Sequence, residues 1–74
     1  MGLKIPYNLS AKTSNFPEVS SGVKRVTLIL INGRKISEVY LERGEIVKIG
    51  SKPISGISDL NFSIFEIKEV VSEI

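Results

Sequence analysis

The pair Asn32-Gly33 lies between two apolar, β-branched runs and constrains the fold of this chain more than any other feature. Residues 26–31 precede the pair and residues 36–41 follow it. Asn and Gly adopt the positive φ angles that tight hairpin turns require, so this arrangement predicts a β-hairpin. We therefore expect antiparallel β-sheet at the centre of the protein.

The register of this hairpin follows from the positions of the apolar side chains. A three-residue loop, with Gly33 in the left-handed conformation, pairs Leu28 with Ile36 and keeps the apolar residues of the first strand on one face. A two-residue loop instead pairs Leu28 with Ser37. Because register follows the apolar face, we expect the three-residue loop.

The second strand of the hairpin, expected over residues 34–42, has apolar side chains that are out of phase. Ile36 occupies an even position, whereas Val39 and Leu41 occupy odd positions. Since side chains alternate between the two faces of a strand, all three face inward only if an extra residue is inserted. The sequence therefore predicts a β-bulge near residues 37–38, and the bend that it causes is typical of small barrels.

Turn-forming residues divide the chain after the hairpin. Arg43-Gly44 predicts a turn into a short third strand over residues 45–49, with Val47 and Ile49 facing inward. The glycines and the proline within residues 50–58 then predict a loop.

Residues 59–74 are compatible with two structures. From Leu60 onward the apolar residues fall at helical spacing and Asp59 could serve as an N-cap, which is typical of an amphipathic helix. The abundance of Ile, Val and Phe favours a strand instead. We expect a short helical turn near residues 63–66 and a last strand over residues 67–73. The alternative is one continuous helix.

Apolar and polar residues alternate near the N-terminus, from Leu3 to Leu9. This period of two predicts a strand. Pro6 has no N–H group for an interior ladder, so such a strand is expected at the edge of the sheet.

Residues 10–22 are polar and rich in turn-forming residues, so we expect a loop or a mobile arm. The alternative is that this segment packs on the domain through Phe16 and Val19. We accordingly divide the chain into an N-terminal arm or edge strand, residues 1–22, and a small β-barrel domain, residues 23–74.

Together these elements indicate an all-β protein, a small and partly open barrel of about four to five antiparallel strands with one short helical turn. The alternative class is α+β, a hairpin or meander followed by a C-terminal helix over residues 59–74. The hairpin around Asn32-Gly33-Arg34, the bent second strand and the helical turn before a terminal strand resemble an SH3-like barrel. The resemblance covers residues 23–73 and concerns architecture.

Two segments are similar to the motifs of Sm-like RNA-binding proteins, a group of small SH3-like barrels. Residues 26–36 resemble their first motif, and Arg43-Gly44-Glu45-Ile46-Val47 resembles their second. Ser37-Glu38-Val39 stands where such proteins place a glycine, and the Asp and Asn of their RNA-binding loop have no counterpart before Arg43. The resemblance therefore implies a barrel, and no RNA-binding residue is carried over.

The composition argues against catalysis and metal binding. The chain of 74 residues has no Cys and no His, so it lacks the most common general acid–base residue and the usual zinc ligands. We expect no enzyme, no cofactor and no dedicated metal site. The absence of Cys fits a cytoplasmic protein. The longest apolar stretch, Leu28–Ile31, is too short to cross a membrane, so we expect no membrane association.

The mild net charge of +2 leaves a few basic residues and one tyrosine as candidates for a binding surface. These candidates are Arg34, Lys35, Tyr40, Arg43 and Lys48. We expect a small binding module that contacts another protein or a second copy of itself through a strand edge or an apolar groove. The alternative is a weak nucleic-acid-binding protein in which Arg34, Lys35 and Arg43 contact phosphates and Tyr40 stacks on a base.

Overall fold

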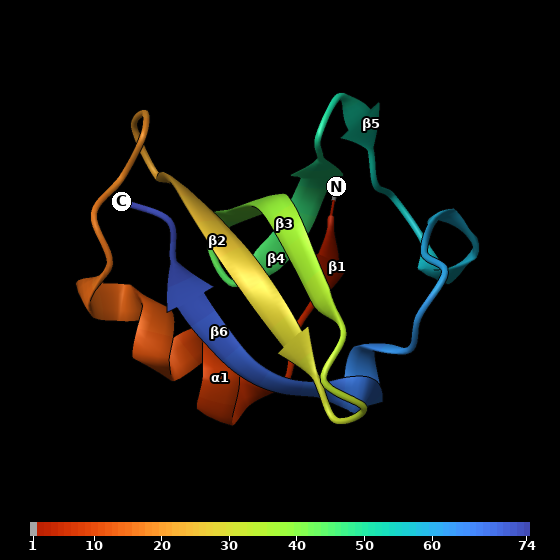
Figure 1. Cartoon of the computed structure of the whole chain (residues 1–74). Coiled ribbons are helices and arrows are strands. Elements are labelled where there is room, and N and C mark those ends of the chain that lie inside the picture. The colour runs from red at the N-terminus through yellow and green to blue at the C-terminus, as the bar shows by residue number, and fades with distance from the viewer. Residues whose placement is uncertain (1) are drawn as a thin grey trace.

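Antiparallel strands dominate the computed structural model, which describes residues 2–74 (Figure 1). In the described chain, six strands form one curled sheet in the order β1-β4-β3-β2-β6, and β5 pairs with β4. The strands are β1 (Leu3–Lys4), β2 (Val23–Leu30), β3 (Lys35–Glu42), β4 (Glu45–Ile49), β5 (Lys52–Pro53) and β6 (Ile67–Ser72). The helical segments are α1 (Tyr7–Lys12) and the 3-10 turns η1 (Thr13–Asn15), η2 (Ile57–Asp59) and η3 (Ile64–Glu66). The predicted all-β class is confirmed as a mostly-β fold, and residues 2–74 form a half-barrel with one short α-helix.

The central hairpin has the predicted three-residue loop and register. Leu28 lies opposite Ile36, and the Leu30 N–H donates to the Arg34 carbonyl at 2.8 Å. Gly33 has a φ of 89°, and its N–H donates to the Leu30 carbonyl at 2.9 Å. A side chain is strained at such a φ, so Gly33 lets the chain reverse at low cost.

The predicted bulge is present in β3. Val26 pairs with Val39 and Leu28 pairs with Ile36, so two residues of β3 oppose Thr27 alone. Glu38, the second of these residues, has a φ of 56°. The extra residue restores the phase of the strand, so that Val39 is fully buried and Ile36 packs at the margin of the core.

The core lies inside the curled sheet and draws residues from most of the chain. Its buried members are Ile5, Leu9, Val26, Leu28, Leu30, Val39, Leu41, Ile46, Ile54, Ile67 and Val70. Burial of such side chains contributes roughly 1.5–3 kcal/mol each to folding.

The N-terminal region differs from the prediction of a strand followed by a loop. β1 is an edge strand as expected, but it ends at Lys4, and the predicted alternation continues into the helix α1. Pro6 is the N-cap of this helix, a position whose N–H has no partner within the helix, so the missing N–H of proline is tolerated there. Leu9 is then buried, whereas Tyr7 points to solvent. Burial of Leu9 against the sheet outweighs the strand pattern.

The segment after α1 packs on the domain through one of the two predicted residues. Phe16 lies against the core, whereas Val19 is exposed. Thr13 is buried, and its hydroxyl donates to the Ser10 carbonyl at 2.7 Å. The prediction of a loop or mobile arm over residues 10–22 is therefore wrong for its first half.

The third strand has the predicted bounds, and of its two predicted inward residues Ile49 packs against the core whereas Val47 does not. Ile46 is fully buried, whereas Val47 is only partly buried. The cause is a register shift between β3 and β4, where Tyr40 pairs with Lys48 and Leu41 pairs with Ile46. Val47 has no partner in this ladder, and the prediction that it faces inward is wrong.

The C-terminal segment confirms the turn followed by a strand, and the continuous helix over 59–74 is wrong. Ser63 and Glu66 form a capping box around η3, and β6 follows it directly. The open edge of β2 provides the physical reason, because Leu28 pairs with Val70 across the two strands. A strand there completes backbone hydrogen bonds that a helix would leave unmade.

The predicted loop over residues 50–58 also contains structure. β5 forms a small hairpin with β4, and Ile54 just beyond it is buried. In the part of the chain that the structure describes, no helix is long and apolar enough to span a membrane.

Candidate binding site

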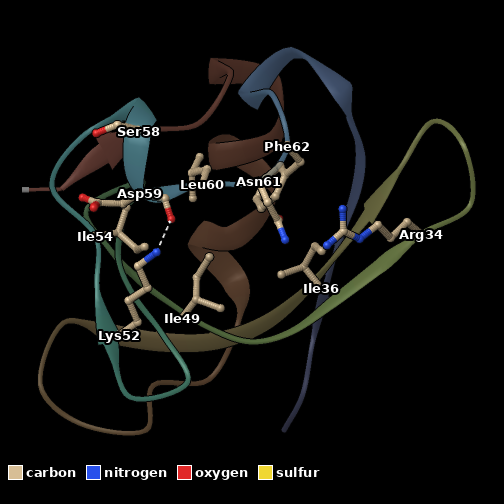
Figure 2. A pocket seen from close by; sticks show the side chains of 10 residues that line it. All are labelled: Arg34, Ile36, Ile49, Lys52, Ile54, Ser58, Asp59, Leu60, Asn61 and Phe62. Carbon is tan, nitrogen blue, oxygen red and sulfur yellow. Dashed lines mark hydrogen bonds between the residues drawn. The ribbon is translucent and has the colours of Figure 1, made fainter.

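A hollow of about 400 Å³ lies between the sheet and the segment that leads from β5 to η3. Its floor is apolar. The residues that line it are Arg34, Ile36, Ile49, Lys52, Ile54, Ser58, Asp59, Leu60, Asn61 and Phe62 (Figure 2). A volume of several hundred Å³ is in the range of small-molecule and side-chain binding pockets.

The wall of the hollow away from the sheet is shaped by one carboxylate. Asp59 Oδ2 accepts hydrogen bonds from the Ser55 N–H at 2.9 Å and from the Gly56 N–H at 3.2 Å. These backbone hydrogen bonds lower the pKa of the Asp59 carboxyl, and the one from Ser55 has the larger effect. Lys52 Nζ donates to the Asp59 carbonyl at 3.0 Å and ties this wall to β5 (Figure 2).

Positive charge borders the hollow. Arg34 begins the return from the hairpin loop, and its side chain lies beside Ile36 at the side of the hollow opposite Asp59 (Figure 2). Within residues 2–74 Arg34 forms no salt bridge. Two cations, Arg34 and Lys52, and one carboxylate, Asp59, line the hollow, so its net charge is positive.

This arrangement can bind a group that is partly apolar and partly anionic. Aliphatic side chains of the floor favour an apolar group, because contact removes both surfaces from water. The Arg34 guanidinium can donate two parallel hydrogen bonds to a carboxylate or a phosphate. Among the residues that the structure describes, no group of three or more His, Cys, Asp or Glu could hold a metal ion.

The structure does not bring the five predicted site residues together. Arg34 lines the hollow, and Lys35, which follows it at the start of β3, is exposed outside it. Tyr40 and Lys48 lie opposite each other on neighbouring strands, with Lys48 Nζ 4.6 Å from the centre of the Tyr40 ring. This cation–π contact is on the outer face of the sheet. Arg43 lies at the far end of β3 from Arg34.

Arg43 instead lines a second hollow of about 460 Å³ with residues of the N-terminal region. Lys4 and Tyr7 also line it, and 85% of Tyr7 is exposed. The Ile5 N–H donates to the Gly44 carbonyl at 3.1 Å and joins the N-terminal segment to the β3–β4 turn. This second hollow therefore combines two cations and an exposed aromatic ring.

Sequence reasoning missed most of the first hollow. Lys52, Ile54 and Leu60 fall in or near a segment that the glycines and proline marked as a loop. The sequence signal that could have indicated it is the presence of Ile and Leu in that loop, because apolar side chains are unfavourable in a loop that is fully exposed to water.

No protein-family model matches this sequence, and the searches of curated proteins and of solved structures give no match either. The function must therefore be inferred from the geometry of the site itself.

Proposed function

We propose that this protein is a binding module that recognises a short segment of a partner protein in the first hollow. The segment places an apolar side chain on the floor of Ile36, Ile49 and Leu60 and an acidic group near Arg34. The observation that carries the proposal is the combination of an apolar floor with an arginine that has no ionic partner in residues 2–74.

The architecture supports this proposal. Strands β5, β4, β3, β2 and β6 are neighbours in that order, and a 3-10 turn precedes the final strand. This arrangement is compatible with an SH3-like barrel, a fold that serves many unrelated functions. We infer binding rather than catalysis because the hollow offers shape and charge, and its residues include no His or Cys.

The proposal is tested by titrating labelled protein with a short peptide of leucine and glutamate and following backbone chemical shifts. We expect shifts at residues that line the hollow, and weaker binding by a peptide in which lysine replaces glutamate. Arg34→Ala should raise the Kd about tenfold, since a charge-assisted hydrogen bond contributes roughly 1.5 kcal/mol or more.

Lys35→Ala is the matched control, because this neighbouring cation is exposed and does not line the hollow. It should bind the glutamate peptide with unchanged affinity. Equal losses in the two variants, or shifts that lie outside the hollow, would contradict the proposal.

The second hollow supports a second candidate function, weak binding of single-stranded nucleic acid. Tyr7 offers an exposed ring for base stacking, and Lys4 and Arg43 offer phosphate contacts. Fluorescence anisotropy with single-stranded RNA and DNA tests this candidate. Binding should weaken as salt rises and should be reduced by Tyr7→Ser. Salt-independent binding would exclude it.

A further inference from the structure

Phe65 is the most exposed large apolar side chain of the described residues, with 88% of its surface accessible. It lies in η3, whose conformation is fixed by groups other than its ring. The Phe65 N–H donates to Ser63 Oγ at 3.2 Å, and the Ser63 N–H donates to Glu66 Oε1 at 2.8 Å. These hydrogen bonds fix the backbone of the turn, which presents the Phe65 ring to solvent.

Ile31 forms a second part of this surface. It lies at the tip of the β2–β3 hairpin and is 66% exposed. Its N–H donates to the Glu66 carbonyl at 2.8 Å, so the hairpin tip and η3 are joined (Figure 1). We call Ile31 and Phe65 the apolar tip. The backbone hydrogen bond places these two exposed apolar side chains at the same end of the molecule, where they form a candidate contact surface.

The apolar tip and the first hollow belong to the same end of the barrel. Arg34 lines the hollow and lies in the same hairpin as Ile31. Phe62 also lines the hollow and is separated from Phe65 by one residue of η3 and by Ser63. One end of the molecule thus carries both a protruding aromatic ring and an unfilled apolar hollow.

We infer that the partner bound in the hollow is a second copy of this chain. The inference rests on the proposed function, which requires an apolar side chain next to an acidic group. Phe65-Glu66 is such a pair on the surface of the same chain. In a twofold dimer each copy inserts Phe65 into the hollow of the other and brings Glu66 close to the other copy's Arg34.

Charge complementarity supports a second copy as the occupant. Glu66 Oε1 accepts the capping hydrogen bond, and Oε2 accepts none from the residues that the structure describes. Arg34 likewise forms no salt bridge within residues 2–74. In the twofold dimer the same surface patch of both copies is in contact, so two equivalent Glu66–Arg34 pairs form, one in each direction.

The small size of the contact sets the expected affinity. Two aromatic anchors and their surroundings place the dimer at the lower end of known interface areas. We therefore expect a reversible dimer with a Kd on the order of 10 µM to 1 mM.

Sedimentation equilibrium over a concentration range that brackets this Kd tests the inference. The mean mass of the wild-type chain should rise from that of a monomer toward that of a dimer and no further. Phe65→Ser should weaken the dimer more than about tenfold, as expected for a central aromatic anchor. Glu66→Gln should weaken it by a few-fold only, because glutamine keeps the capping box while removing the charge.

Ile74→Ser is the matched control for Phe65→Ser. Both residues are exposed apolar side chains, and Ile74 follows β6 and lines neither hollow. This control should dimerise as the wild type does. In a sample that mixes labelled and unlabelled chains, intermolecular NOEs should connect the Phe65 ring with methyl groups of Ile36 and Leu60.

Three results would overturn the inference: a monomer at all concentrations tested, a dimer that Phe65→Ser leaves unchanged, or association that continues beyond a dimer. A monomer that still binds the leucine–glutamate peptide would refute self-association and leave the proposed function intact. A dimer with the predicted NOEs but no peptide binding would show that the hollow is specific for its own chain.

Discussion

Two carboxylates, Glu73 and Asp59, each accept hydrogen bonds from backbone N–H groups, yet they stabilise different regions. Glu73 Oε2 accepts from the Thr27 hydroxyl at 2.6 Å and from the Glu38 N–H at 2.8 Å. These hydrogen bonds join β2, the bulge of β3 and the residue that follows β6. Within residues 2–74 the Asp59 carboxylate accepts hydrogen bonds only from Ser55 and Gly56, its close neighbours in the sequence.

Glu73 makes a tertiary contact, whereas the contacts of the Asp59 carboxylate are local. Glu73 connects segments that are 46 and 35 residues apart, and Arg25 Nε lies 3.0 Å from its other oxygen. Asp59 connects residues that are four and three positions apart. A contact between distant segments is lost when the chain unfolds, whereas a local turn can persist in the unfolded chain. Glu73 should therefore matter for global stability and Asp59 for the shape of the hollow.

The largest expected effect is that of Glu73→Ala. The variant leaves the Thr27 hydroxyl and the buried Nε of Arg25 without their acidic partner. We expect the free energy of unfolding to fall by about 1–2 kcal/mol. For a domain of this size that corresponds to a fall in Tm of roughly 4–8 °C per kcal/mol.

Thermal and chemical denaturation measure this loss, and Glu69→Ala is the control. Glu69 pairs with Lys12 of α1, and these side chains are 41% and 49% exposed. Exposed pairs contribute little to stability. If the two variants lose the same stability, the distinction between a tertiary and a superficial carboxylate is wrong.

Acid should weaken the Glu73 contact in a defined direction. Two hydrogen bonds lower the pKa of Glu73 below its ordinary value of 4.5. The one from the Thr27 hydroxyl has the larger effect, followed by the one from the Glu38 N–H. A group whose pKa is lower in the folded chain stabilises the fold above the unfolded pKa and loses that contribution as the pH falls through the folded pKa. The stabilisation should be complete above about pH 4.5 and decline below it.

Unfolding measured from neutral pH to acid checks this expectation when wild type is compared with Glu73→Gln. The difference in stability between the two proteins should shrink below the ordinary pKa of glutamate. Asp59 and Glu69 also have lowered pKa values, but both variants retain them, so their contributions cancel. A difference that stays constant with pH would assign the Glu73 effect to packing instead of charge.

Local contacts of the fold can be predicted from the sequence, whereas contacts between distant segments cannot. The hairpin register and the bulge follow from Leu28, Ile36 and Val39, because an apolar face and a turn signal determine them locally. The hydrogen bond between the Glu38 N–H and Glu73 cannot be predicted from local sequence patterns, because the residues around either position give no indication of the other. Side-chain contacts between distant segments depend on the folded geometry.

The N-terminal helix shows a second limit. Alternation up to Leu9 predicts a strand, and a helix as short as α1 has little stability of its own. The segment forms a helix because the open side of the curled sheet can then bury Ile5 and Leu9. Of the candidate site, Arg34 was predicted, whereas Leu60 and Phe62 enter it only through the path of the chain after β5.

A smaller effect, opposite in sign, is expected from Glu38→Gly. Glu38 is exposed and has a φ of 56° at the bulge, a conformation that is unfavourable for residues with a Cβ. Its N–H, which glycine retains, provides the bond to Glu73. We expect a gain of roughly 0.5–1 kcal/mol from relief of this strain, reduced by the greater freedom of glycine in the unfolded chain.

Chemical denaturation of Glu38→Gly measures this gain, and Glu38→Ala is the informative control. Alanine removes the same carboxylate but keeps the Cβ, so it should not be more stable than wild type. Equal stabilisation by both substitutions would mean that the charge of Glu38, and not its backbone conformation, is the unfavourable element.

The smallest global effect is expected from Asp59→Ala. The partners of the carboxylate lie within one turn, so the free energy of unfolding should change by no more than about 0.5 kcal/mol and Tm by no more than about 2–4 °C. Amide exchange at Ser55 and Gly56 should accelerate, and chemical shifts should change along the wall of the hollow. Binding of the leucine–glutamate peptide should weaken without a loss of stability. A fall in Tm comparable to that of Glu73→Ala would show that the loop, and not only the sheet, is part of the cooperative unit that unfolds.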